Sequence, residues 1–196
     1  MVIEPVVLQG RGVRLEPLNA DRHHAGLAAA IEDGALWELP VTVVPHPRDL
    51  PAFFASAASA LLAQRELAFA TIDRASDTVV GSTRFRCIEI AHRRVEIGFT
   101  FIAARWQRSH INTEAKCLML QHAFEHWGCN RVELLTDVLN TRSRAAIARL
   151  GAQQEGVLRQ HMVMRDGRIR DSVIFSITRS DWPGVRRGLE QRLARG

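Results

Sequence analysis

The sequence lacks several features that would point to particular classes of protein. It has no tyrosine, and its three cysteines, Cys87, Cys117 and Cys129, show no Cys-x-x-Cys spacing. An odd number of scattered cysteines is typical of buried thiols in a reducing compartment, so we expect a cytoplasmic protein. No apolar run approaches the roughly 20 residues that a membrane-spanning helix needs, and residues 1–9 do not have the pattern of a secretory signal.

Lysine is also nearly absent: Lys116 is the only lysine, and the other 25 of the 26 Lys and Arg residues are arginines. The formal net charge is +5, carried almost entirely by arginine, a bias that suggests a GC-rich bacterial genome. Arginine suits phosphate groups because its guanidinium is planar and always charged, although a solvated basic surface explains the charge equally well. The chain has no nucleic-acid-binding motif and few aromatic residues, which disfavours nucleic acid as a partner.

Apolar periodicity divides the chain into alternating strands and helices. The predicted strands span residues 13–18, 67–73, 79–90, 94–102, 131–137, 153–164 and 170–178, and the predicted helices span 21–32, 51–64, 112–127, 142–150 and 181–195. This order predicts the α/β class: a mixed, mostly antiparallel sheet with helices on both faces. The length fits a single domain, residues 1–196, with a C-terminal helix at about 181–195.

The most informative stretch runs from Arg105 to Ala152. It begins with a basic turn that contains Arg105, Arg108 and His110, and a helix, a strand and a second short helix follow. Helix starts bind anions, because unbonded backbone N–H groups and the positive end of the helix dipole point at whatever lies there. The sequence therefore predicts a site for a pyrophosphate at the start of the first helix.

The same stretch resembles the GCN5-related N-acetyltransferases, and in particular the branch of the ribosomal-protein N-terminal acetyltransferases. The resemblance is carried by Gln107, by Thr113-Glu114-Ala115, by the pair Asn140 and Ser143, by Leu150-Gly151 and by the strand Val95–Phe99. It implies the acyl-CoA N-acyltransferase fold and acetyl-CoA as co-substrate, with no metal. His122 and His126 have the spacing of two metal ligands, but no third ligand accompanies them.

The resemblance also implies which residues contact acetyl-CoA. The residues so implied are Gln107, Arg108, Ser109, His110, Ile111, Asn112 and Thr113 for the pyrophosphate, and Phe99, Thr100, Phe101, Asn140 and Ser143 for the pantetheine. His110 and Asn112 stand where the family has glycine and a small residue, so the side chain at 110 must point away from the ligand or contact it. The alternation of Val95, Ile97, Phe99 and Phe101 is typical of a strand whose side chains lie in the core. Only the backbone of these residues would then contact the cofactor.

Two residues are candidates for catalysis. Glu96 is the candidate base, acting through water, and the alternative is a solvent-facing carboxylate paired with Arg84, Arg86 or Arg94. Family members often use tyrosine as the general acid; because tyrosine is absent here, Ser143 or a water molecule is the candidate acid. Asn140 and Ser143 also fit a simple helix cap.

Several neighbouring residues have a simpler expected role. We expect Glu114 to be structural, because an acidic residue in the first helical turn favours the helix dipole. Asp171 could reach the acceptor, but an ion pair with Arg168 or Arg170 is the preferred interpretation.

These observations predict an enzyme that moves an acetyl group from acetyl-CoA to a primary amine, possibly a protein N-terminal α-amine. A small amine such as an amino acid, a polyamine or an antibiotic is an alternative acceptor. A non-catalytic acyl-CoA-binding module is a second alternative, suggested by the altered turn and the missing tyrosine. No membrane partner is indicated, and a homodimer is left open.

Overall fold

The computed structural model describes residues 3–195. The strands are β1 (Leu8–Gln9), β2 (Val13–Pro17), β3 (Leu67–Asp73), β4 (Thr78–Glu89), β5 (Arg94–Ile102), β6 (Arg131–Asp137), β7 (Gln153–Val163) and β8 (Ile169–Thr178). The helices are α1 (Ala20–Glu32), α2 (Leu50–Leu62), α3 (His110–Gln121), α4 (Thr141–Arg149) and α5 (Trp182–Arg195). All predicted strands and helices are present within a few residues. Among residues 3–195, the elements not predicted are the two-residue strand β1 and the short 3₁₀ helices Leu36–Glu38, Pro47–Asp49 and Ala104–Trp106.

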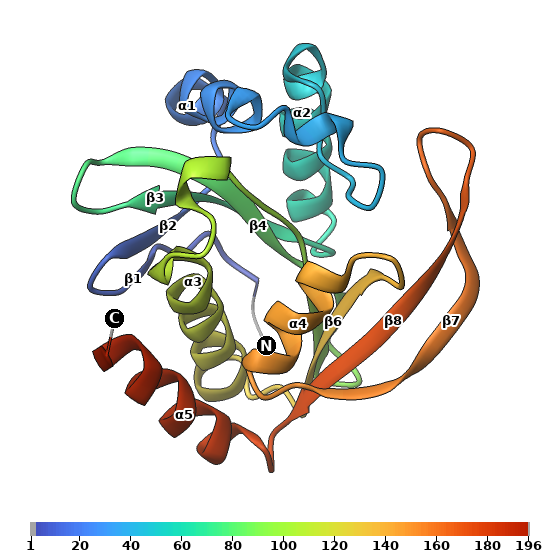
Figure 1. Cartoon of the computed structure of the whole chain (residues 1–196). Coiled ribbons are helices and arrows are strands. Elements are labelled where there is room, and N and C mark those ends of the chain that lie inside the picture. Colours follow the sequence, from blue (N-terminus) through green and yellow to red (C-terminus); the bar gives the residue numbers. More distant parts are fainter. Residues whose placement is uncertain (1–2, 196) are drawn as a thin grey trace.

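The eight strands form one sheet in the order β1-β2-β3-β4-β5-β6-β8-β7. Every neighbouring pair is antiparallel except β5 and β6, which run parallel. The predicted mixed, mostly antiparallel sheet is therefore confirmed. The β7–β8 hairpin extends well beyond the rest of the sheet (Figure 1).

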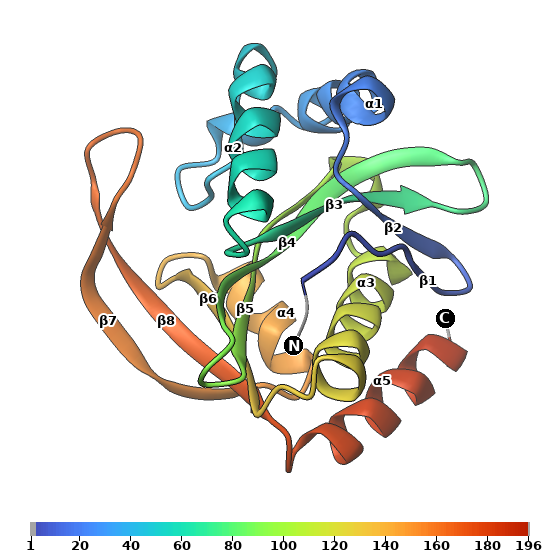
Figure 2. The same cartoon turned by 180° about the vertical axis from the view of Figure 1, so that it is seen from behind.

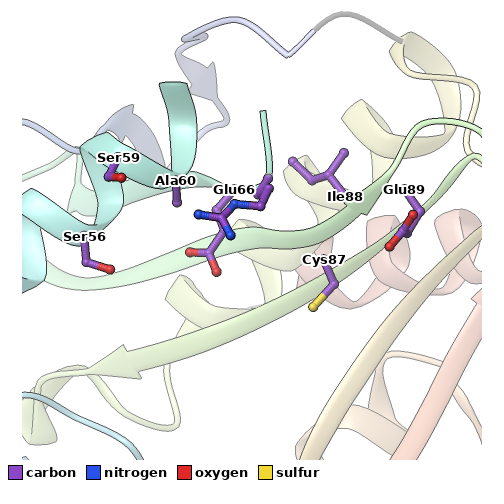
Figure 3. A pocket seen from close by; sticks show the side chains of 8 residues that line it. Ser56, Ser59, Ala60, Glu66, Cys87, Ile88 and Glu89 are labelled. Carbon is purple, nitrogen blue, oxygen red and sulfur yellow. The ribbon is translucent and has the colours of Figure 1, made fainter. Parts of the chain in front are cut away.

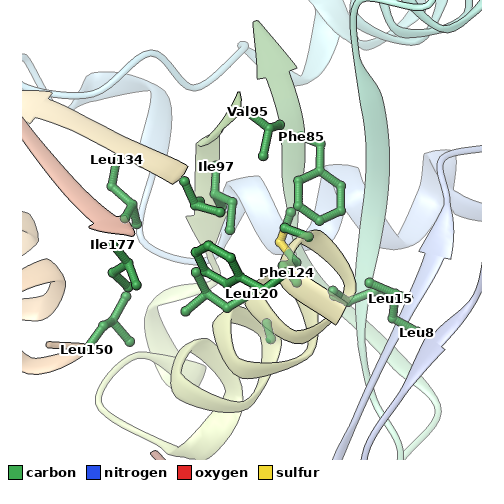
Figure 4. Close-up of a cluster of buried hydrophobic side chains, with 14 of the residues drawn as sticks. Leu8, Leu15, Phe85, Val95, Ile97, Leu120, Phe124, Leu134, Leu150 and Ile177 are labelled. Atoms are coloured by element: carbon green, nitrogen blue, oxygen red, sulfur yellow. The ribbon is translucent and has the colours of Figure 1, made fainter. Parts of the chain in front are cut away.

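Helices cover both faces of the sheet, as the two views in Figures 1 and 2 show. Helices α3, α4 and α5 share the larger apolar core with the sheet, and this core contains Phe85, Val95, Ile97, Leu120 and Ile177 (Figure 4). On the other face, α1 and α2 pack around a smaller cluster that includes Phe101 of β5. Strand β5 thus contributes side chains to both cores: Val95 and Ile97 to the larger one and Phe101 to the smaller one.

Helix α3 starts two residues before the predicted position. The side chain of Ser109 accepts a hydrogen bond from the backbone N–H of Ile111, so Ser109 is the N-cap and His110 is the first helical residue. The helix is continued by a π-helical turn over His122–His126, which brings its end to Trp127 as predicted. Serine is among the preferred N-cap residues, so the cap was readable in the sequence.

A β-bulge interrupts β5 and overturns part of the predicted alternation. Arg84 of β4 pairs with Gly98, and Ser82 pairs with Phe101, so Thr83 faces two residues, Phe99 and Thr100. Phe99 has a φ of 46°, a left-handed conformation that is rare for a bulky residue. The bulge reverses which side chains face α3, so Phe99 is only partly buried on the α1/α2 face and Phe101 joins the smaller core.

Candidate active site

The two parallel strands β5 and β6 part soon after they begin. They pair only between residues 94–96 and 131–133, although β5 continues to Ile102 and β6 to Asp137. Over the remaining residues β6 pairs with β8 and β5 with β4, so the two facing edges do not bond to each other. Backbone N–H and C=O groups need partners, and an extended ligand lying between the strands would supply them.

Two helices begin at the wide end of this opening. Helix α3 follows β5 after a short turn, and α4 follows β6 after Asn140. The two helix starts are tied together, since Arg142 donates a hydrogen bond to Gln107 Oε1 at 2.7 Å and Gln107 donates to the carbonyl of Ile102 at 2.9 Å. The positive ends of two helix dipoles therefore lie at the same end of the opening.

The side chain of His110 points away from this opening. A methyl group placed on Gly12, in the turn between β1 and β2, would lie 2.5 Å from His110 Nε2, so the imidazole is packed against that turn. Strand β2 lies four positions from β6 in the sheet. Of the two orientations that the sequence left open for position 110, the structure has the one directed away, and the backbone at the start of α3 remains uncovered by this ring.

Glu114 helps to hold the same turn in place. Its carboxylate accepts hydrogen bonds from the backbone N–H of Gly12 at 3.1 and 3.2 Å, and the residue is buried. The structural role expected for Glu114 is thus present, and it fixes α3 against β1 and β2.

Asn140 caps α4. Its Oδ1 accepts a hydrogen bond from the backbone N–H of Ser143 at 3.0 Å, so the helix-cap alternative describes what this side chain does in the structure. Within residues 3–195 the amide nitrogen of Asn140 donates no hydrogen bond, which leaves it to a ligand. Ser143 lies half-buried in the first turn of α4 and, within residues 3–195, has no direct hydrogen bond to Glu96.

Glu96 lies where β5 and β6 part, and it is only 7% exposed. Because the residue is buried, the alternative of a solvent-facing carboxylate is wrong. The pairing with Arg86 that belonged to this alternative is present, since Glu96 Oε1 lies 3.4 Å from Arg86 Nη1. Burial raises the pKa of Glu96, and the charge of Arg86 and a hydrogen bond from the Cys87 thiol lower the pKa in part. A carboxylate with a raised pKa is suited to take up a proton.

Several arginines surround Glu96 that the sequence did not single out as site residues. Arg86 stacks on Phe99 with its guanidinium carbon 4.2 Å from the ring centre. Arg170 of β8 is buried, donates to Ser172 Oγ at 2.9 Å, and its charge also lowers the pKa of Glu96. The alternation of β4 and β8 could have placed Arg86 and Arg170 on one face, but only the sheet order brings β8 close to β5.

The tip of the β7–β8 hairpin is fixed to the loop before α2. Arg165 donates to the carbonyl oxygens of Trp37, at 3.0 Å, and Val44, and Arg168 donates to that of Pro40 at 3.0 Å. Arg168 also pairs with Asp137. The predicted ion pair between Asp171 and Arg168 or Arg170 is therefore wrong.

Asp171 has a different partner because the bulge in β7 brings a backbone N–H to it. Its Oδ1 accepts a hydrogen bond from the N–H of Gln160 at 2.7 Å.

A groove of about 400 Å³ lies between α2 and the sheet (Figure 3). It is lined by residues from the end of α2, the segment before β3 and the end of β4: Ser56, Ser59, Ala60, Arg65, Glu66, Cys87, Ile88 and Glu89. Arg86 links the groove to Glu96, because its guanidinium lies 3.8 Å from the groove residue Glu66 and 3.4 Å from Glu96. The groove and Glu96 thus lie on the same face of the sheet, opposite α3.

Neither a metal-binding cluster nor a membrane-spanning helix is present among residues 3–195. No group of three or more His, Cys, Asp or Glu residues within that range could hold a metal ion. Over the same residues, no helix is both long and apolar enough to cross a membrane.

A mostly antiparallel sheet that splits at one parallel pair, with two helices starting at the wide end, defines the acyl-CoA N-acyltransferase class. A family model of the acetyltransferase (GNAT) domain matches residues 13–153. The chain therefore belongs to the GNAT family, and the resemblance drawn from Gln107, Asn140 and Ser143 is confirmed at the level of the family.

Individual relatives agree with this membership. A GCN5-related N-acetyltransferase from Brucella melitensis has 34% sequence identity and a TM-score of 0.86, over 97% of this chain and 86% of that one. RimJ of Mycobacterium smegmatis, solved in complex with CoA-disulfide, has 23% identity and a TM-score of 0.80, over 95% of this chain and 91% of that one, which shows the shared fold.

The curated relatives match over a shorter range. YoaA of Bacillus subtilis, described as an uncharacterized N-acetyltransferase, is 29% identical over 106 residues, 54% of this chain. The chain spans 59% of the length of YoaA.

Proposed function

We propose that this protein is a cytoplasmic enzyme that transfers an acetyl group from acetyl-CoA to a primary amine, with a protein N-terminal α-amine as the preferred acceptor. The observation that carries the proposal is the buried carboxylate of Glu96 at the point where β5 and β6 part. A protected base beside an opening for an extended ligand is what amine acetylation requires.

The residues at the opening fit acetyl-CoA. The pyrophosphate would be held by backbone N–H groups at the start of α3, near Arg108 and Arg142, and the pantetheine by the unpaired edge of β5 at Phe99–Phe101 and by Asn140. The side chain of His110 does not obstruct this site, because it packs on Gly12. When bound, acetyl-CoA supplies a thioester whose C–S bond breaks as the new C–N bond forms.

The proposed roles of the protein side chains follow from their placement. Glu96 accepts the proton of the acceptor amine through a water molecule. A backbone N–H at Phe99 or Thr100 hydrogen-bonds the thioester carbonyl oxygen, where negative charge develops. Ser143 or water returns a proton to the departing thiolate, since the chain has no tyrosine for this step.

The charges near Glu96 favour an α-amine over a polycation. The neighbouring carboxylates are already paired with arginines: Glu66 with Arg84, Glu133 with Arg94 and Arg131, and Asp137 with Arg168. Of the two carboxylates that line the groove, Glu66 is thus paired, and Glu89 has no ion pair among residues 3–195, so a polyamine or a cationic antibiotic would find a single unpaired negative charge here. An α-amine has an ordinary pKa of about 7.7–8.0, against about 10.4 for a lysine amine, so it loses its proton more easily at neutral pH.

Acetyl-CoA binding is the first test of the proposal. We expect acetyl-CoA at about a hundred times its dissociation constant to stabilise the protein by roughly 2.7 kcal/mol, which raises the melting temperature by several degrees. Thermal unfolding followed with and without acetyl-CoA measures this shift, with adenosine as a control that lacks the pyrophosphate and the thioester. No shift at millimolar acetyl-CoA would contradict the proposal, and a shift without turnover on any amine would favour the non-catalytic acyl-CoA-binding module.

Filling the groove between α2 and the sheet should weaken acceptor binding only. We expect Ser59→Phe to raise KM for an N-terminal peptide about tenfold, because the ring would occupy space that the peptide needs, and to leave the acetyl-CoA thermal shift unchanged. Ala58→Phe is the matched control, since Ala58 is exposed on the same helix but does not line the groove. Equal peptide KM values in steady-state assays of the two variants would exclude the groove as the acceptor site.

A further inference from the structure

The only lysine of the chain is buried beneath the opening between β5 and β6. Lys116 lies on α3 and is 5% exposed. Its Nζ donates to Thr100 Oγ1 at 2.6 Å and to Thr83 Oγ1 at 3.1 Å, and the two hydroxyls lie 2.8 Å apart and bond to each other. Three polar groups from α3, β4 and β5 thus form a closed triangle.

This triangle surrounds the bulge in β5. Thr83 is the one residue of β4 that faces the two bulged residues Phe99 and Thr100. Lys116 therefore joins the residue opposite the bulge to a residue within it. The left-handed φ of 46° at Phe99 is unfavourable for a bulky side chain and persists only where its surroundings hold it.

The Lys116 amine is bound by hydroxyl groups and not by a carboxylate. Its Nζ donates to the hydroxyls of Thr100 and Thr83, and within residues 3–195 no acidic side chain forms an ion pair with it. Burial lowers the pKa of Lys116 to about 7. A buried amine whose pKa is lowered and which lies beside a cleft is a candidate for a functional role.

Charged groups near Lys116 are directed elsewhere. On α3, Glu114 bonds to the backbone of Gly12. On β4 and β5, Arg84, Arg86 and Glu96 lie on the opposite face of the sheet, where they pair with one another and with Glu66. The protonation of Lys116 is therefore governed by its burial.

We propose that Lys116 is a positioning residue that holds the β5 bulge, through Thr83 and Thr100, in the shape that places the backbone of Phe99–Thr100 against the acetyl thioester. This inference rests on the proposed function, because it assumes that acetyl-CoA lies along β5. Lys116 itself does not touch the reacting atoms; it acts through Thr100.

A single lysine makes a direct spectroscopic test possible. In protein labelled with ¹³C at the lysine Cε, Lys116 gives one NMR signal, and Arg187→Lys adds an exposed lysine on α5 as an internal reference. We expect the reference to titrate near its ordinary pKa of about 10.4 and Lys116 several units lower, and we expect acetyl-CoA to move the Lys116 signal alone. Lys116 titrating with the reference would overturn the inference.

Kinetics test the coupling to Thr100. We expect Lys116→Met and Thr100→Val each to lower kcat about tenfold, with the acetyl-CoA thermal shift retained, and the double variant to be no worse than either alone. Met119→Leu is the control, because Met119 also contacts Thr83 from α3 but carries no amine. Lys116→Met should also remove a pH inflection near 7 from kcat.

The outcomes separate this inference from the proposed function. Absence of acetyl-CoA binding to the wild-type protein would end the proposed function and this inference with it. Binding and turnover with an unmoved Lys116 signal, or additive losses in the double variant, would overturn the inference and leave the proposed function standing. If Lys116→Met does not fold, the NMR titration of the wild-type protein and the Thr100→Val variant still decide.

Discussion

Replacing Glu96 by glutamine is expected to lower kcat for an amine acceptor by about 10²–10³-fold, because glutamine keeps the shape of the side chain but cannot take up a proton. The backbone of β5 and the starts of α3 and α4 are untouched by this change, so acetyl-CoA should still raise the melting temperature of the variant. Steady-state kinetics with an N-terminal peptide, together with thermal unfolding, measure the two effects separately.

The pH dependence of the wild-type enzyme should identify the same group. Burial raises the pKa of Glu96 above its ordinary value. A base must be ionised to accept a proton, so kcat should fall as the pH drops through this raised pKa, at a higher pH than for an exposed glutamate. Glu96→Gln should lose this acidic limb, because glutamine does not titrate.

Glu133→Gln is the matched control for this prediction. Glu133 is the register partner of Glu96 on β6, but it pairs with Arg94 and Arg131. Its negative charge raises the pKa of Glu96, so its removal should move the acidic limb to lower pH with little loss of maximal rate. Full turnover of Glu96→Gln at neutral pH would remove Glu96 from the role of base.

Removal of Glu66 should cause the largest loss of stability. Arg84 is 3% exposed, and its charge is balanced by Glu66, whose Oε2 lies 3.0 Å from Arg84 Nη1. Glu66→Ala leaves this arginine charged and buried without a partner, which we expect to destabilise the fold by about 3–5 kcal/mol. In a chain of this size the melting temperature should fall by roughly 10 °C, as thermal unfolding would show.

Two further variants make this prediction specific. Glu190→Ala removes an exposed ion pair of similar length with Arg186 and should lower the stability by less than about 1 kcal/mol. Adding Arg84→Met to Glu66→Ala should recover much of the loss, since no buried charge then remains. If Glu66→Ala is no more destabilising than Glu190→Ala, the ion pair between Arg84 and Glu66 contributes no more to stability than an exposed pair.

Local sequence patterns determined the secondary structure and the family of this protein. The strands and helices could be predicted because apolar periodicity and cap residues such as Asn140 act within a few positions of the chain. The predicted start of α3 and the predicted end of α2 were each two residues late, and at α3 the cap is Ser109 rather than a later residue. The order of the elements then favoured the mixed sheet, and the motif residues indicated the family.

Only the tertiary structure decided how side chains far apart in the sequence meet. The bulge at Phe99 depends on the register between β4 and β5, and it reversed the predicted alternation. The direction of the His110 side chain depends on a close approach to Gly12, about a hundred residues earlier. The burial of Lys116 between two threonines depends on how α3 packs on the sheet.

The physical reason is the range of the interactions involved. Periodicity and capping are set by neighbouring residues, so a sequence displays them directly. Register, bulges and the partners of buried charges are set by pairing between distant segments, and the free energies of alternative pairings differ by amounts that no local pattern reveals. For this protein, the sequence by itself determined the elements and the family, and the packing of α3 and β8 around β5 determined the environment of Glu96.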